Sequence, residues 1–284
     1  MKKSISLFIL ILFPFIAFSQ EATREFEYTI EYPGLHHPLT VKVKVPADYD
    51  SSDQGYGVLY YTDSAISYGF VNDLVETLSW EQLPKLITVG IDVTPEARSK
   101  GRNFILTPTA WEVMESYLDV TSGEMGGAPI FLECIKQKIV PMIEEEFRTV
   151  PGERTLMGHS FGGLFGLFAL FEEPSYFKNY VVGSPSLFWD EKLMLKLENE
   201  YSKNNDNLGV NLFMAVGTAE DAEFVDMDAD LQEFVEHLQS RNYQGLNLGT
   251  KVWDGQQHMA SMFLSYTEGV GFVFADAKPE VGSN

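Results

Sequence analysis

Apolar and polar residues alternate along the chain in patterns that predict strands and helices in turn. Period-two alternation at 26–32 and 39–45 predicts two strands joined at Pro33-Gly34, and apolar runs at 56–62 and 86–93 predict buried strands. Further strands are expected at 155–158, 180–183, 211–216 and 248–253, and helices at 71–80, 129–147 (kinked or divided at Pro141), 162–171, 191–201, 228–241 and 259–274. This alternation predicts an α/β fold with a mostly parallel central sheet and helices on both faces.

One segment departs from this pattern. Residues 94–128 are polar and rich in Gly, Pro, Ser and Thr, and they are too many for a simple connector. Loops of this length tend to be functional. Neither a repeat nor a linker divides the remaining chain, so we expect a single domain over residues 21–284, with a weakly specified tail after Ala275.

The first twenty residues have the pattern of a secretory signal peptide. Lys2 and Lys3 precede an apolar run from Ile5 to Phe18, and two small residues, Ala17 and Ser19, stand two positions apart at its end. The run is short for a membrane span, although an uncleaved N-terminal anchor is the alternative. We therefore expect residues 1–20 to be removed and the protein to be periplasmic or secreted, without stable membrane association.

The composition narrows the possible partners. Among 284 residues, 41 Asp and Glu face 20 Lys and Arg, a formal charge of −21. Loss of the two signal-peptide lysines makes this 18 − 41, or −23. Such a chain lacks the clustered cations that nucleic-acid binding needs. Cys134 is the single cysteine, and no Cys/His cluster has zinc-ligand spacing, so we expect no disulfide, metal or other cofactor. No obligatory protein partner is evident.

The candidate chemistry lies in residues 158–163, which read GHSFGG. This G-x-S-x-G motif stands between a predicted strand and a predicted helix, the context of a nucleophile elbow; the alternative is a glycine-rich turn. The elbow predicts that Ser160 is a nucleophile. It also makes the Phe161 amide, at the positive end of the following helix, the first oxyanion donor.

A nucleophilic serine needs a base, and His258 has the suitable position. It follows the last predicted strand in a loop, at the end of the sheet where catalytic groups gather. His36 and His37 precede the elbow, His159 lies within it, and His237 falls in a predicted helix. The expected chain order of nucleophile, acid and histidine agrees with His258.

The acid is expected after the strand at 211–216, where Glu220 and Asp221 are adjacent candidates. Glu220 is preferred narrowly, and each of these carboxylates has an alternative reading as a solvated or helix-capping group. Glu223 and Asp226 follow closely. A second oxyanion amide is expected from the loop after the strand at 56–62, with Ser64 as the candidate.

Several motifs together resemble the putative-esterase (esterase D-like) family of the α/β-hydrolase superfamily. They are GHSFGG at 158–163, RNFILTP at 102–108 (similar to the family's R-x-R-D-L-T-P), GSPSLFWD at 183–190 (similar to S-P-S-x-W-W), and the loop at 255–258. The resemblance covers most of the chain after residue 20. It departs at Asn103-Phe104-Ile105, where the family's Asp is replaced.

The resemblance implies an α/β-hydrolase fold and a serine esterase. Carried over by position, Ser160 is the nucleophile, His258 the base and Glu220 the orienting acid, although some siderophore-esterase members use a Ser-His dyad. The family includes siderophore esterases, S-formylglutathione hydrolases, feruloyl and acetyl xylan esterases and mycolyltransferases. A small-molecule or glycan ester is therefore the implied substrate.

Candidate substrate-binding residues lie near these motifs. Arg98 and Arg102, with Lys100, form a basic cluster in an acidic chain, which suits an anionic substrate such as a ferric catecholate; an ordinary solvated loop is the alternative. Trp189 is a candidate for stacking on an aromatic or sugar ring, or else a packing residue. We expect an exported serine carboxylic ester hydrolase acting on siderophore-type lactones. The alternatives are a feruloyl or acetyl polysaccharide esterase and a non-catalytic binding module of the same fold.

Overall fold

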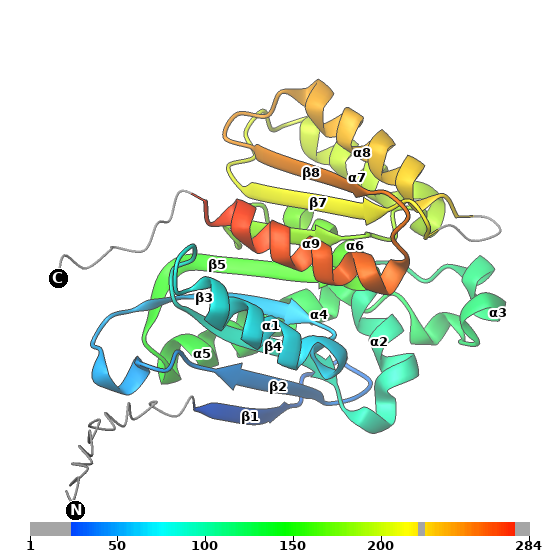
Figure 1. Cartoon of the computed structure of the whole chain (residues 1–284). Helices are drawn as coiled ribbons and strands as arrows, with labels where there is room; N and C mark the ends of the chain where they lie inside the picture. Colours follow the sequence, from blue (N-terminus) through cyan, green and yellow to red (C-terminus); the bar gives the residue numbers. More distant parts are fainter. Residues whose placement is uncertain (1–23, 221–224, 276–284) are drawn as a thin grey trace, which may run out of the picture.

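The computed structural model describes residues 24–220 and 225–275 (Figure 1). Within these ranges one eight-stranded sheet has the order β1-β2-β4-β3-β5-β6-β7-β8. The strands are β1 Glu25–Ile30, β2 Leu39–Lys44, β3 Tyr56–Thr62, β4 Leu86–Val93, β5 Thr149–His159, β6 Asn179–Gly183, β7 Asn211–Gly217 and β8 Asn247–Trp253. The β1-β2 and β2-β4 pairs are antiparallel, and all later pairs are parallel. The predicted mostly parallel sheet is thus confirmed.

Helices cover both faces of this sheet. They are α1 Ser64–Leu78, α2 Arg98–Leu106, α3 Glu115–Leu118, α4 Ala128–Cys134, α5 Val140–Glu146, α6 Phe161–Glu172, α7 Trp189–Ser202, α8 Met227–Arg241 and α9 His258–Val273. In Figure 1, α1 and α9 lie on the near face, and α6, α7 and α8 lie on the other. Each face has its own apolar cluster, because residues alternate along every strand.

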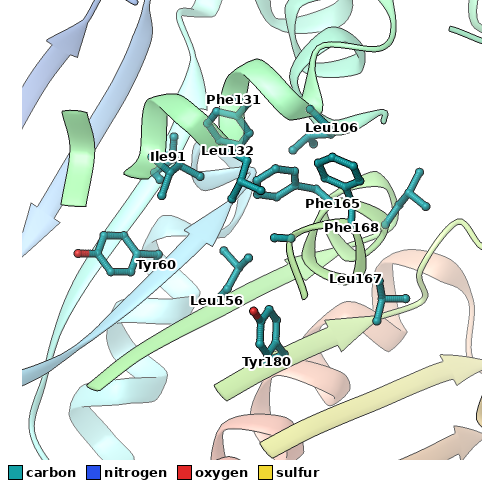
Figure 2. Packing of buried hydrophobic residues seen from close by; sticks show 14 of the residues in the cluster. Tyr60, Ile91, Leu106, Phe131, Leu132, Leu156, Phe165, Leu167, Phe168 and Tyr180 are labelled. Atoms are coloured by element: carbon teal, nitrogen blue, oxygen red, sulfur yellow. The ribbon is translucent and has the colours of Figure 1, made fainter. Parts of the chain in front are cut away.

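The larger cluster surrounds α6, the helix that follows the nucleophile elbow. Phe165 and Phe168 of α6 pack with Phe131 of α4 over Leu156 and Tyr180 of the sheet (Figure 2). Every residue of α6 from Phe161 to Phe171 is buried, so the helix is apolar on all sides rather than amphipathic. This packing fixes the helix N-terminus relative to the sheet edge.

Some predicted boundaries were wrong. Helix α1 begins at Ser64 rather than at residue 71. Its first turns were missed because two buried serines, Ser64 and Ser67, interrupt the apolar spacing; the Ser67 hydroxyl donates to the Asp63 carbonyl at 3.0 Å. Strand β5 begins at Thr149 rather than at residue 155. Its first six residues, TVPGER, are exposed or partly exposed and include a Pro and a Gly, so the sequence did not indicate a strand there. Exposed strand positions carry little hydrophobic signal.

The 94–128 segment is not a structureless loop. It contains α2, α3 and short 3₁₀ turns at Pro95–Ala97, Glu112–Met114 and Ser122–Glu124. Helix α2 has a Gly and three cations in nine residues, which hid its period, but Phe104, Ile105 and Leu106 at its end are buried. The predicted effect of Pro141 is found: a π-helical turn at Ile135–Ile139 separates α4 from α5.

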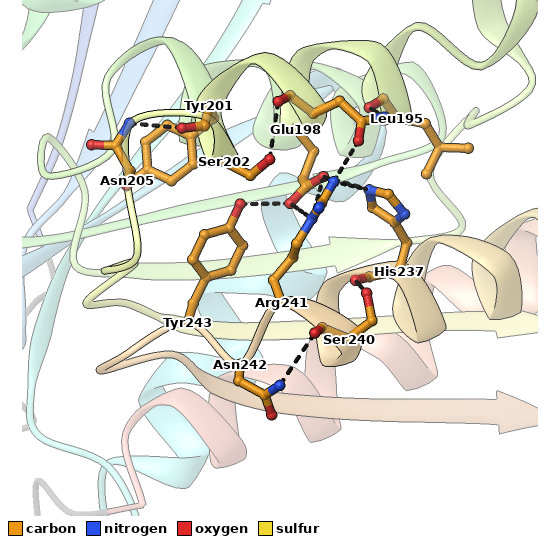
Figure 3. Close-up of polar contacts among 11 residues, drawn as sticks. Leu195, Glu198, Tyr201, Ser202, Asn205, His237, Ser240, Arg241, Asn242 and Tyr243 are labelled. Carbon is orange, nitrogen blue, oxygen red and sulfur yellow. Dashed lines mark hydrogen bonds and ion pairs between the residues drawn. The ribbon is translucent and has the colours of Figure 1, made fainter.

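A buried carboxylate joins α7 to α8 (Figure 3). Glu198 of α7 is fully buried and accepts hydrogen bonds from Arg241 Nε at 3.0 Å and from the Tyr243 hydroxyl at 2.5 Å. Its second oxygen contacts His237 Nε2 and Arg241 Nη2. Because all these donors come from α8 and the residues after it, the network holds α7 and α8 together, and His237 has a structural role in it.

Candidate active site

Ser160 occupies a strained turn between β5 and α6. Its φ of 61° and ψ of −122° fall outside the usual regions for a residue with a side chain, and its N–H donates to the Gly183 carbonyl at 2.9 Å. Its neighbours must be small: a Cβ on Gly158 would lie 2.2 Å from the Gly162 carbonyl oxygen, and one on Gly162 would lie 2.2 Å from Thr62 Oγ1. This is the geometry of a nucleophile elbow.

His258 and Glu220 form a hydrogen-bonded pair. His258 is the first residue of α9, and its Nδ1 lies 2.6 Å from Glu220 Oε2. The Glu220 side chain is fully buried, whereas 38% of the His258 side chain is exposed. An imidazole held through Nδ1 presents Nε2 to the reacting groups, as a general base requires.

The second oxygen of Glu220 is also satisfied. Oε1 accepts the Ser184 hydroxyl at 2.8 Å and the Gly217 amide at 2.5 Å. Burial by itself raises the pKa of Glu220, but hydrogen bonds from His258, Ser261, Ser184 and the Gly217 amide together hold that pKa below its ordinary value. Glu220 is therefore ionised at neutral pH, where its negative charge can stabilise a protonated His258.

The other candidate acids are not in the same position. Asp221 and Glu223 lie outside the described residues. Asp226 caps α8, its carboxylate accepting the Ala229 amide at 2.9 Å, as the alternative reading of these acids suggested.

Two serines that the sequence reasoning missed complete the histidine support. Ser184 Oγ lies 3.0 Å from Ser261 Oγ, and the Ser261 hydroxyl is 2.9 Å from the carbonyl oxygen of His258. Ser184 belongs to the GSPSLFWD motif but had itself been given no role, and Ser261 stands one helical turn after His258. The spacing of Ser261 was a signal that sequence reasoning could have used.

The sheet brings the serine and the histidine pair to one edge. His159 pairs with Gly183 of β6, Gly183 with Ala215 of β7, and Gly217 with Trp253 of β8. Ser160, Glu220 and His258 follow the ends of β5, β7 and β8 along this edge. Among the described residues, the Ser160 hydroxyl makes no direct hydrogen bond to His258; such bonds are often loose before substrate binds.

His159 links the elbow to the histidine. His159 is 4% exposed, and its ring centroid lies 4.4 Å from that of His258, with 45° between the planes. Burial, and next the nearby charge of His258, lower the pKa of His159 to about 3. It is therefore a neutral aromatic support at neutral pH.

The loop after β3 lies beside the elbow, but not all of its backbone N–H groups are free to donate to an oxyanion. The Ala65 amide donates to Asp92 Oδ2 at 2.9 Å, which removes it as an oxyanion donor. The amides of Asp63, at φ 58°, and Ser64 are the remaining candidates. Phe161 is the first residue of α6, so its amide has no acceptor within the helix.

Arg102 is engaged by this loop rather than open to a substrate. Its Nε and Nη2 donate to the two carboxylate oxygens of Asp63 at 2.5 and 2.8 Å. Burial by itself lowers the pKa of Arg102, but the adjacent Asp63 carboxylate outweighs it and raises that pKa. The guanidinium carbon also lies 5.5 Å from the ring centroid of Phe161. Arg102 thus holds the β3 loop against the elbow.

The predicted basic cluster is mostly neutralised within the chain. Lys100 pairs with Glu124 at 2.9 Å, as Arg102 pairs with Asp63. Arg98 is partly buried, and its charge lowers the pKa of Asp92, although burial of that carboxylate has the larger effect and raises it. The contrast with the acidic surface is therefore smaller than the sequence suggested.

Trp189 offers no surface for stacking on a substrate. Its side chain is fully buried, its indole N–H donates to Thr109 Oγ1 at 3.2 Å, and its ring packs edge-on 5.2 Å from Phe161. The expectation of direct substrate contact therefore does not fit this structure. Trp189 instead packs against Phe161, the first residue of α6.

Comparisons with known proteins agree with this geometry. A family model described as "Putative esterase" matches residues 33–261. The chain belongs to that family. Ferri-bacillibactin esterase BesA of Bacillus subtilis is 28% identical over 217 residues, 72% of this chain and 74% of that protein. A siderophore enterobactin esterase of Emericella nidulans is 34% identical over 119 residues, 39% of this chain and 38% of that protein.

The fold agrees with the same assignment. The crystal structure of an IroE-like serine hydrolase from Shewanella oneidensis matches with a TM-score of 0.79 and 25% identity, covering 93% of this chain and 83% of that one. This member of the family is a serine esterase of the α/β-hydrolase type, as the sequence predicted. In the described ranges, no helix is long and apolar enough to cross a membrane, and no three His, Cys, Asp or Glu side chains gather as a metal site.

The neutral state of His159 predicts an acid-sensitive fold. Between pH 6.5 and about 3, the unfolded chain binds a proton at His159 that the folded chain does not, so the free energy of unfolding falls as pH falls. The slope from this group is at most about 1.4 kcal/mol per pH unit. His159→Gln should flatten the decline, measured by urea unfolding at pH 7, 5.5 and 4. The exposed His37→Gln should not, and equal slopes in both variants would contradict the assignment.

The Glu220 pair predicts a specific catalytic defect. Glu220→Gln removes the charge that stabilises the imidazolium, so kcat for p-nitrophenyl acetate should fall by about 10²–10⁴ with little change in KM. Asp226→Asn, which alters only a helix cap, serves as the matched control. An unchanged kcat in Glu220→Gln would indicate a Ser-His dyad instead.

Proposed function

We propose that this protein is an exported serine ester hydrolase that cleaves siderophore-type lactones through an acyl-enzyme. The observation that supports this most is the Ser160 elbow at the same sheet edge as the buried Glu220–His258 pair. A non-catalytic binding module has no need of a strained serine beside an oriented imidazole.

The chemistry follows from these groups. His258 Nε2 takes the proton of Ser160 as its Oγ attacks the ester carbonyl, and Glu220 stabilises the resulting imidazolium. The amide of Phe161 and that of Asp63 or Ser64 stabilise the oxyanion. As the carbon–oxygen bond breaks, His258 gives the proton to the leaving alcohol. Water, activated by the same imidazole, then releases the acid and restores Ser160.

The substrate class is supported by relatives whose names describe siderophore esters. Ferri-bacillibactin and enterobactin are the substrates named for the two sequence relatives above. The pairing of Arg102 with Asp63 and of Lys100 with Glu124, together with a formal charge of −21, disfavours a strongly anionic ligand. We therefore propose that the iron-free lactone is a better substrate than its ferric complex.

Turnover of a substrate panel tests the function. The wild type should hydrolyse an enterobactin-type trilactone, faster without iron than with it, and more efficiently than feruloylated sugars or acetylated xylan. Ser160→Ala should abolish turnover and labelling by a fluorophosphonate while the circular dichroism spectrum is unchanged. A labelled Ser160 with turnover only of xylan esters would favour the polysaccharide esterase. No labelling would favour the binding module.

Export is proposed from the first twenty residues, which lie outside the described residues. If the signal peptide is removed, expression of the full chain in a bacterium should yield a periplasmic or secreted protein whose intact mass lacks about twenty N-terminal residues. Replacing Leu10 and Leu12 by Asp should keep the chain uncleaved in the cytoplasm, because it interrupts the apolar run. A mature wild-type protein that retains Met1 would contradict export by cleavage.

A further inference from the structure

Two neighbouring helices carry an exposed apolar surface at the catalytic edge of the sheet. The exposed fractions are 48% for Ile66 of α1, and 50%, 39% and 36% for Met259, Phe263 and Leu264 of α9. Phe70 of α1 is partly exposed beside them. We call these five residues the apolar rim.

The rim is continuous across the two helices. The rings of Phe70 and Phe263 meet edge to face, with centroids 4.7 Å apart and planes at 83°. Figure 1 shows α1 and α9 side by side on the near face of the sheet. The other exposed residues in the first two turns are Ala65, Gly69 and Ala260, which add no charge.

The rim adjoins the catalytic groups at both helix starts. Helix α1 begins directly after Asp63, in the loop after β3 that holds the candidate oxyanion amides, and α9 begins with His258. Side chains on a helix tilt toward its N-terminus. Ile66 and Met259, in the first turns, therefore lean toward the edge where Ser160 lies.

Contiguous exposed apolar side chains beside a catalytic edge are typical of a binding surface. Five side chains are too few for a stable dimer interface, which needs about 800 Å² from each partner. An anionic membrane is opposed by the formal charge of −21. What remains is a ligand small enough for the rim and held next to Ser160, namely the substrate.

We propose that the apolar rim binds an uncharged aromatic group of the ester substrate and so determines which acyl groups are preferred. This inference rests on the proposed ester hydrolysis and refines its substrate class. A phenyl ring placed against Phe263 can continue the edge-to-face contact that Phe70 already makes. Charged or very short acyl groups gain nothing from the rim.

Two p-nitrophenyl esters with the same leaving group isolate this effect. Wild-type kcat/KM should be about ten- to thirtyfold higher for the 3-phenylpropionate than for the acetate, the gain that burial of an aromatic group allows. The double variant Ile66→Asn/Phe263→Asn should lower this ratio to about 1, because the acetate carries no group that gains from the rim. Trp80→Gln, which removes an exposed apolar residue just beyond the C-terminal end of α1, should leave the ratio at its wild-type value.

A binding measurement separates this inference from the proposed function. In the Ser160→Ala protein, uncharged 3-phenylpropionamide should shift the methyl NMR signals of Ile66 and Met259, and the double variant should bind it at least tenfold more weakly. If acetate is hydrolysed but the wild-type ratio is near 1, or the double variant keeps the ratio, the rim has no such role. If no ester is hydrolysed, hydrolysis itself is refuted. Even then, the methyl shifts test separately whether the rim binds aromatic groups, and the absence of these shifts would overturn the proposal for the rim.

Discussion

The buried carboxylate of Glu220 is the interaction on which the arrangement of this site depends. A fully buried anion is costly unless its oxygens are satisfied by donors. Here Ser184, directly after β6, Gly217 of β7 and His258 of α9 each contribute one. The same bonds that keep it ionised therefore fix the ends of two strands relative to the first turn of a helix. The position of the His258 imidazole follows from its being one of the hydrogen-bond donors to this carboxylate.

A second ion pair serves the other side of the nucleophile in a similar way. Asp63 has a left-handed backbone at the end of β3, and Arg102 holds its carboxylate with two hydrogen bonds while lying near the Phe161 ring. The two candidate sources of oxyanion amides are thus joined by one cation from α2. The segment at 94–128 contributes to the site mainly through this support, rather than through free positive charge.

The sequence was informative where a residue's environment is local. The glycines and serine at 158–162 prescribe their own turn, and the strand periods predicted the sheet. His258 and Glu220 were proposed as a pair because both follow strand ends, and their side chains are in contact. The sequence was uninformative where a partner is distant: nothing near Arg102 reveals Asp63, 39 residues earlier, and nothing near Trp189 reveals that it is buried against Phe161. Ion pairs and aromatic packing across a sheet edge arise from topology, which residue spacing does not encode.

The strained backbone of Ser160 has a consequence for the stability of the folded chain. A side chain at φ 61° and ψ −122° costs of order 1–3 kcal/mol, which glycine at that position would largely avoid. Glycine at residue 160 is therefore expected to stabilise the fold without disturbing the turn. The strain is tolerated for the side chain alone, so the hydroxyl that the proposed chemistry requires comes at a cost in the stability of the folded chain.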